Sequence, residues 1–172
     1  MERTKWFDRK FDFGFTQNIF PSVIERLRGT PVRLEEKLKN ISNDLANAKL
    51  NGDWSVKENI GHLIDLEPLW MGRLEDILNE KTDLRPADLT NAKTNEANHN
   101  DRSVKQLLDE FRSVRAMTTK KIELLSVEQI YMSALHPRLK TPMRTMDHFL
   151  FVAEHDDHHL VTIHNLIQTQ HS

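Results

Sequence analysis

A single long helix is predicted by the run FLFVAEHDDHHLVTI, residues 149–163. At about 3.6 residues per turn, one face of this helix carries Val152, His155, His159, Ile163 and Leu166. His155 and His159 are one helical turn apart, so their imidazoles project side by side from that face. Two histidines at this spacing within an apolar stripe can offer two nitrogen ligands to one metal ion.

The composition is typical of a water-soluble globular protein. With 172 residues, of which 38% are hydrophobic and 29% charged, we expect one domain over residues 1–172. Only 5 glycines and 6 prolines leave little material for turns, which favours long helices over many short strands. A formal net charge of -2 gives no electrostatic reason for binding nucleic acid or an anionic membrane surface.

Several other properties follow from what the sequence lacks. No apolar run approaches the roughly 20 residues that are needed to span a bilayer. The first residues, Met1 to Trp6, lack the apolar core of a secretion signal. Without cysteine there is no disulfide, no thiolate zinc site and no cysteine nucleophile. The expected location is therefore the cytoplasm.

The N-terminal region is predicted to begin with an irregular arm and to continue into a first helix. Residues 1–19 are rich in aromatic side chains, and we expect them to cover the core, with part of the arm at a subunit interface. Gly29-Thr30-Pro31 has the order of a helix stop, an N-cap and a proline at the first helical position. The first long helix is therefore expected from about Pro31 to Ala48, with Val32 facing inward.

Capping patterns predict where two further helices begin. Ser55 with Glu58, and Ser103 with Gln106, each have the spacing of a capping box. The expected elements are a second helix to about Asn79 with a kink at Pro68, a polar crossover over 80–101, a third helix to about Leu125, a turn over 126–131, an irregular linker over 136–142, and a fourth helix from about Met143 to Thr169. Four long helices with one long connection between the second and third predict an all-α four-helix bundle.

A third candidate ligand, His62, lies within the wide apolar arc of the second helix. A lone histidine on such a face is usually a core residue bonded to a carbonyl, and that alternative stays open for His62. Together with His155 and His159 it would complete three protein ligands and leave a position for water, as in catalytic zinc sites. An all-nitrogen set suits one divalent ion, with zinc or nickel favoured over iron or manganese.

Two carboxylates are candidates for catalytic roles. Glu67 lies in the apolar arc of the second helix and could act as a base or orient water; the alternative is an ion pair with Arg73 or with a neighbouring helix. Asp156, at the edge of the inward face, could orient an imidazole, or it could be a partly exposed surface carboxylate. His136 could close over the mouth of the site, although an ordinary loop residue is favoured, and His158 is expected to face solvent.

Three segments together resemble a known family: Trp54-Ser-Val-Lys-Glu58, Gly61-His62-Leu63-Ile64, and Ala153-Glu-His155-Asp-Asp-His158-His159. They are similar to the DinB/YfiT-like superfamily of four-helix-bundle metalloproteins, over about residues 20–169. The resemblance implies an up-down-down-up helix order with a long second connection. It also implies a divalent metal on His62, His155 and His159, and frequent homodimers.

The same resemblance suggests three functions. Characterised relatives include S-transferases and isomerases that use thiols such as bacillithiol, mycothiol or glutathione, and many others are described as metal-dependent hydrolases. We therefore expect a metal-dependent enzyme that activates the thiol of a low-molecular-weight cosubstrate or water and acts on a small molecule. The alternatives are a hydrolase of a small ester or amide, and a non-catalytic metal-binding or ligand-binding stress protein.

Overall fold

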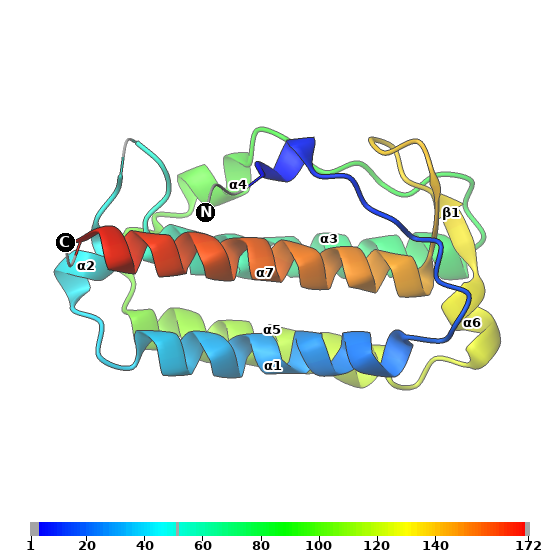
Figure 1. Ribbon diagram of the computed structural model, residues 1–172, viewed down its shortest axis with the longest axis horizontal. Coiled ribbons are helices and arrows are strands. Elements are labelled where there is room, and N and C mark those ends of the chain that lie inside the picture. Colours follow the sequence, from blue (N-terminus) through cyan, green and yellow to red (C-terminus); the bar gives the residue numbers. More distant parts are fainter. Residues whose placement is uncertain (1–3, 51, 171–172) are drawn as a thin grey trace.

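Four long helices lie side by side in the computed structural model, which describes residues 4–50 and 52–170 (Figure 1). They are α1 (Phe20–Leu38), α3 (Val56–Leu78), α5 (Val104–Ile122) and α7 (Thr145–Gln170). Helices α1 and α7 run in one direction and α3 and α5 in the other, and both α1 and α3 pack against α5 and α7. The predicted all-α four-helix bundle, with its up-down-down-up order, is confirmed.

Shorter elements connect the long helices. They are η1 (Trp6–Asp8), α2 (Asn43–Asn47), α4 (Ala92–Glu96), η2 (His99–Asp101), α6 (Val127–Tyr131), β1 (Ser133–Leu135) and β2 (Pro142–Arg144). The connection after α3 returns along the length of the bundle and carries α4 and η2 (Figure 1). The N-terminal arm, this connection and the loop between the two strands all lie along the side formed by α3 and α7.

The predicted start of the first helix at Pro31 is wrong, because α1 continues through Gly29-Thr30-Pro31. Proline has no N–H, so the carbonyl of Leu27 loses its helical partner, but Nη1 of Arg115 donates to that oxygen at 3.4 Å. The Thr30 hydroxyl, fully buried, donates to Asp156 Oδ2 at 2.8 Å instead of capping a helix. Contacts with α5 and α7 therefore stabilise a continuous helix at the point where the local sequence predicts a helix start.

Other boundaries also differ from the prediction. The first helix ends at Leu38 and is followed by the separate helix α2, while Val32, predicted to face inward, is 52% exposed. Residues predicted to form a turn contain α6, and the linker ends in an antiparallel pairing of β1 with β2. Strands of three residues are too short to show a two-residue period in the sequence. Helix α3 continues through Pro68.

The N-terminal arm packs against α7 as expected, over its described residues. The Trp6 ring lies 5.0 Å from the rings of both Phe151 and His155, and Phe11 lies 5.0 Å from Phe151. Arg9 forms an ion pair with Glu154 and also donates from Nη1 to the Glu154 carbonyl at 3.4 Å. Residues 1–3 lie outside the described part of the chain. The arm is therefore fixed to the helix that carries two of the three candidate ligands.

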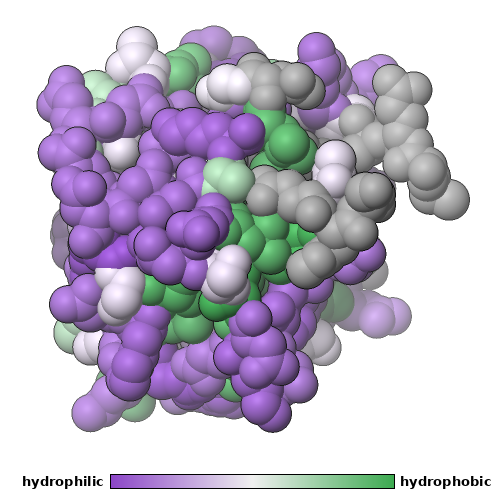
Figure 2. Space-filling model, turned by 90° about the vertical axis from the view of Figure 1, so that its left-hand side faces the viewer, coloured by the Kyte–Doolittle hydropathy of each residue, from purple (hydrophilic) through white to green (hydrophobic). Residues whose placement is uncertain are grey.

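Buried apolar side chains form two clusters along the bundle, one around Trp70, Phe149 and Met146 and the other around Leu34, Ile60 and Phe111. Viewed from the end near α2, hydrophobic residues gather towards the middle and hydrophilic ones surround them (Figure 2). No helix among the described residues is long and apolar enough to cross a membrane. The homodimer and the cytoplasmic location stay predictions.

Candidate metal centre

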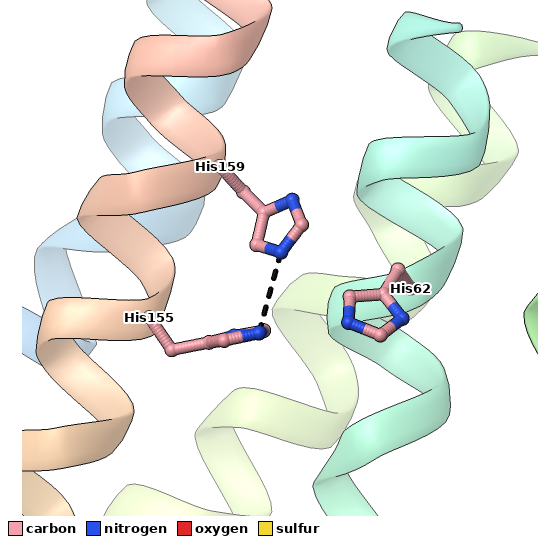
Figure 3. Close-up of side chains that lie close together, drawn as sticks. All are labelled: His62, His155 and His159. Atoms are coloured by element: carbon pink, nitrogen blue, oxygen red, sulfur yellow. Dashed lines mark hydrogen bonds between the residues drawn. The ribbon is translucent and has the colours of Figure 1, made fainter. Parts of the chain in front are cut away.

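The three predicted ligands meet between α3 and α7. His62 comes from α3, and His155 and His159 come from successive turns of α7 (Figure 3). One ring nitrogen from each lies within 4.8 Å of the other two, and all three side chains are buried. The Nε2 atoms of His155 and His159 are 3.3 Å apart. Two nitrogens on one tetrahedral zinc ion would be about 3.4 Å apart, so this pair already has the spacing of shared ligands.

A hydrogen-bond chain orients His62. Its Nδ1 lies 3.0 Å from Thr94 Oγ1, and the Thr94 hydroxyl donates to Asp65 Oδ2 at 3.0 Å. Because the threonine proton is used on Asp65, the hydroxyl oxygen accepts from Nδ1–H of His62. The proton of the neutral ring is therefore on Nδ1, and Nε2 presents its lone pair. Metal-binding histidines are commonly held in this way by their other nitrogen.

An amide orients His159 in the same sense. Its Nδ1 lies 2.7 Å from Asn59 Oδ1. The Asn59 amide nitrogen donates to the backbone oxygens of Trp54 and Ser55, at 3.2 and 2.8 Å, which directs its oxygen towards the imidazole. His159 therefore carries its proton on Nδ1, and its Nε2 faces His155.

The start of α3 fixes Asn59 in place. Ser55 Oγ accepts from the Glu58 N–H at 3.1 Å, and the Glu58 carboxylate accepts from the Ser55 N–H at 2.8 Å. This is the predicted capping box, and it sets the first turn of the helix just before Asn59 and His62. The capping box therefore helps to position both His62 and the asparagine that orients His159.

Burial keeps the imidazoles neutral. Desolvation lowers the pKa of His62 to about 4, although the nearby Asp65 opposes that shift. Desolvation also lowers the pKa of His155 well below its ordinary value, with His62 adding to the effect. Nδ1 of His155 has no hydrogen-bond partner in the described part of the chain. Neutral rings keep the lone pairs that a cation needs, so the donor set fits a divalent metal.

Behind His62, a glycine allows η2 to approach closely. A Cβ at Gly61 would lie 2.2 Å from the His99 ring, so only glycine fits here. Nε2 of His99 lies 2.9 Å from Asp65 Oδ2. Burial alone would raise the pKa of Asp65, but hydrogen bonds with His99 and Thr94 hold it below its ordinary value. Asp65 is therefore a buried carboxylate that supports the threonine bonded to His62.

The three histidines open onto a pocket of about 450 Å³. Its walls come from α3, α7, the N-terminal arm, the loop before α4 and the loop between the two strands. All 3 tryptophans of the chain line it: Trp6, Trp54 and Trp70. His136 and His158 also line it, and His136 is only 2% exposed. His136 thus lies in a loop as expected, but it also lines the pocket, which was the alternative for that residue. His158, expected to face solvent, is half-buried in the pocket wall.

The two predicted catalytic carboxylates lie elsewhere, on either side of Arg115. Arg115 Nε donates to Glu67 Oε1 at 2.7 Å, and Nη2 donates to Asp156 Oδ1 at 3.0 Å. The hydroxyls of Thr118 and Thr30 donate to Glu67 and Asp156 respectively. The structure thus brings the three histidines together but pairs both carboxylates with an arginine. Neither carboxylate lines the pocket.

This ion-pair network separates the two apolar clusters. Along α3, α5 and α7, the network residues Glu67, Arg115 and Asp156 lie between the buried residues of one apolar cluster and those of the other. Thr30 has the same position in α1. The carboxylates raise the pKa of the Arg115 guanidinium, although its burial opposes that effect. The expected alternative of an ion pair between helices is therefore what the structure contains for Glu67. For Asp156 the alternative of a partly exposed surface carboxylate is wrong, since its side chain is fully buried.

Sequence reasoning missed Asn59, Asp65, Thr94 and His99. Asn59 and Asp65 are polar residues close to His62 along α3, and that position was a usable signal. Thr94 and His99 lie in the crossover, where no periodicity indicates which residues turn towards the bundle. Their contacts depend on how that connection folds back over α3.

Comparisons with known proteins agree with this architecture. No curated protein matches the chain. Among solved structures, YfiT from Bacillus subtilis, described as a probable metal-dependent hydrolase with an unusual four-helix bundle topology, is similar with a TM-score of 0.81. It shares 19% sequence identity, and the match covers 94% of this chain and 93% of that chain, which shows a common fold. The DinB superfamily model matches residues 26–163, so the chain belongs to the DinB superfamily.

Proposed function

We propose that the protein binds one divalent metal ion through His62, His155 and His159 and is a metal-dependent enzyme acting on a small molecule. The observation that carries this proposal is the convergence of three buried imidazoles on one pocket wall, with two Nε2 atoms 3.3 Å apart. The all-nitrogen donor set favours zinc or nickel, with iron or manganese as alternatives.

The chemistry follows from the site and its support. A divalent metal held there would lower the pKa of a coordinated thiol or water and so supply a nucleophile near neutral pH. Asn59 and Thr94 would keep His159 and His62 in the orientation that presents Nε2. Trp6, whose ring is 5.0 Å from that of His155, contributes a wall of the pocket from the N-terminal arm.

We favour transfer to the thiol of a low-molecular-weight cosubstrate. The chain has no cysteine, so the thiol has to come from a second small molecule. A pocket of about 450 Å³ lies within the size range of small-molecule sites. Attack by water also needs a residue that accepts its proton, and Glu67, the carboxylate predicted for this role, is paired with Arg115.

Hydrolysis of a small ester or amide is the second candidate. His158 lines the pocket beside His159, and an imidazole there could accept a proton from water. The description of YfiT as a probable metal-dependent hydrolase favours the same reaction. The two candidates use the same ligands and differ in the nucleophile, so they can be separated by adding or omitting a thiol.

The first test is the metal content of protein purified without chelators or a histidine tag, measured by mass spectrometry. We expect close to one metal ion per chain in the wild type and almost none in His155→Ala. His164→Ala is the matched control, because His164 is an exposed histidine on the same helix. Equal metal content in the two variants would refute the proposed ligand set.

The second test compares the two reactions with metal-loaded protein. Thiol transfer predicts consumption of monochlorobimane that requires added glutathione or another small thiol and disappears in His159→Ala. Hydrolysis predicts turnover of small esters or amides without any thiol. Bound metal with neither activity would instead support the non-catalytic alternative.

A further inference from the structure

Two arginines differ from all others in the described part of the chain. Nine arginines form an ion pair with a carboxylate: Arg9, Arg26, Arg28, Arg33, Arg85, Arg102, Arg112, Arg115 and Arg144. Arg73 and Arg138 form none among the described residues, and both line the pocket that contains the three histidines. The unpaired guanidinium groups are thus concentrated in one place.

Arg73 is deeply buried, with 2% of its surface exposed. Its Nε donates to the Arg85 carbonyl at 3.0 Å, and its Nη1 lies 3.2 Å from His136 Nε2. Within the described chain, no acceptor faces its Nη2. Burial and the neighbouring Arg138 lower the pKa of Arg73 to about 10, so the group is still a cation at neutral pH. The buried carboxylate of Asp76 is near enough to oppose that shift, but it is paired with Arg85 and Lys81 and forms no ion pair with Arg73. A buried guanidinium without a directly bonded anion is costly, which indicates a place for one beside it.

The contact with His136 points to the same conclusion. Nδ1 of His136 accepts from the backbone N–H groups of Arg138 and Leu139, at 3.2 and 3.1 Å. The neutral ring therefore carries its proton on Nε2, which faces Nη1 of Arg73. Both atoms are donors, so neither can accept from the other. An oxyanion placed beside them would accept from both.

The arginines lie within reach of a molecule at the metal site. The Trp70 ring lies 5.7 Å from Arg73 Cζ and 5.6 Å from the His155 ring. The sum of these two distances is the upper limit for the separation of the guanidinium and the imidazole, which are therefore at most about 11 Å apart. Asp88 is the carboxylate among the lining residues, and it already accepts from Thr90 and from the Ala92 N–H. It is therefore committed to its own loop.

We propose that Arg73, Arg138 and His136 form an oxyanion subsite that binds a carboxylate or phosphate group of the substrate or cosubstrate. The planar guanidinium groups are suited to two-pronged contacts with such oxygens. This subsite would hold the anionic end of a molecule whose reacting end lies at the histidines. The inference rests on the proposed function for the position of the reacting end, whereas binding of the anion itself does not require a metal.

The experiment uses metal-free full-length protein, with the chelator removed by dialysis, titrated with succinate and separately with inorganic phosphate at constant ionic strength. All 3 tryptophans line the pocket, so their fluorescence reports binding there. We expect a saturable change with at least one of the two anions, and the tighter anion identifies the group that the subsite prefers. Arg138→Gln should raise its Kd about 10-fold or more, because a hydrogen bond to a charged group is removed.

Arg73→Gln should have a larger effect, and Arg138, which is only half-buried and lies in a loop, serves if the Arg73 variant does not fold. Arg112→Gln is the matched control, since Arg112 is paired with Glu35 and does not line the pocket. The proposal is overturned if neither anion gives a saturable response, or if Arg138→Gln and Arg112→Gln bind equally well. Because metal is absent, either result leaves the metal test unaffected.

Discussion

Helices α3 and α7 each carry buried polar residues on two different sides, and the two sides are completed differently. Towards α1 and α5, Glu67 and Asp156 are matched by Arg115 and by two threonine hydroxyls. Towards the pocket, His62, His155 and His159 each direct one ring nitrogen to within 4.8 Å of the other two. The first cluster is complete within the chain, whereas the proposed function has the second completed by a metal ion. Burial of a polar group alone therefore does not identify a functional site, because the buried groups of the first cluster satisfy one another.

The largest expected effect comes from removing the charge of Arg115, the cation at the centre of the first cluster. Arg115→Met should lower the free energy of unfolding by about 3–5 kcal/mol, because two buried carboxylates lose their partner. Urea unfolding followed by circular dichroism measures this. In metal-free protein, His155→Leu should cost less than about 1 kcal/mol, because it removes an imidazole whose Nδ1 has no partner.

A triple variant provides the control for that prediction. Combining Arg115→Met with Glu67→Gln and Asp156→Asn removes the charge from the whole network, and most of the lost stability should return. If Arg115→Met and His155→Leu destabilise the metal-free protein equally, the distinction between a complete and an incomplete cluster is wrong.

An intermediate effect concerns the residues that orient the ligands. Thr94→Val removes the acceptor for His62 and should weaken metal affinity about 10–100-fold, with the fold retained. Competition with a chromophoric chelator measures the affinity. Thr118→Val is the matched control, since that threonine bonds to Glu67 in the other cluster. Equal affinity in the two variants would show that the bond to His62 has no part in metal binding.

The smallest effect is a pH dependence from a buried histidine outside both clusters. His148 Nε2 lies 2.9 Å from the Trp70 carbonyl, and burial lowers its pKa to about 3. In the unfolded chain its pKa is near the ordinary 6.5, so the unfolded state binds the proton first as pH falls. Its contribution to stability is complete above pH 6.5 and is lost as pH falls towards 3.

Between pH 7 and pH 5.5 this histidine alone should cost about 1 kcal/mol. His148→Gln keeps a donor for the carbonyl without a group that titrates in this range, so its stability should fall by that much less over the same interval. Urea unfolding of both proteins in chelator at the two pH values measures the difference. The same slope in both would mean that His148 does not titrate as its burial requires.

Periodic signals in the sequence were sufficient for the four helices and for the pair of His155 and His159, whereas the helix order and the place of His62 in the set of three came from the family resemblance. The stripe through His155 and His159 and the capping box at Ser55 are local patterns, and the structure contains both. The sequence was insufficient where a distant residue decides. Pro31 reads as a helix start until Arg115 is found bonded to the Leu27 carbonyl. Glu67 reads as a candidate base until the same arginine is found beside it.

The helix order has a consequence for how the protein is assembled. His62 belongs to the second long helix and His155 to the last, so a cation shared by them would close a loop of about 90 residues. Such a bond can form only after the final helix has docked, and it would then oppose the departure of that helix. Metal binding would thus stabilise the bundle after it has folded and would not nucleate folding.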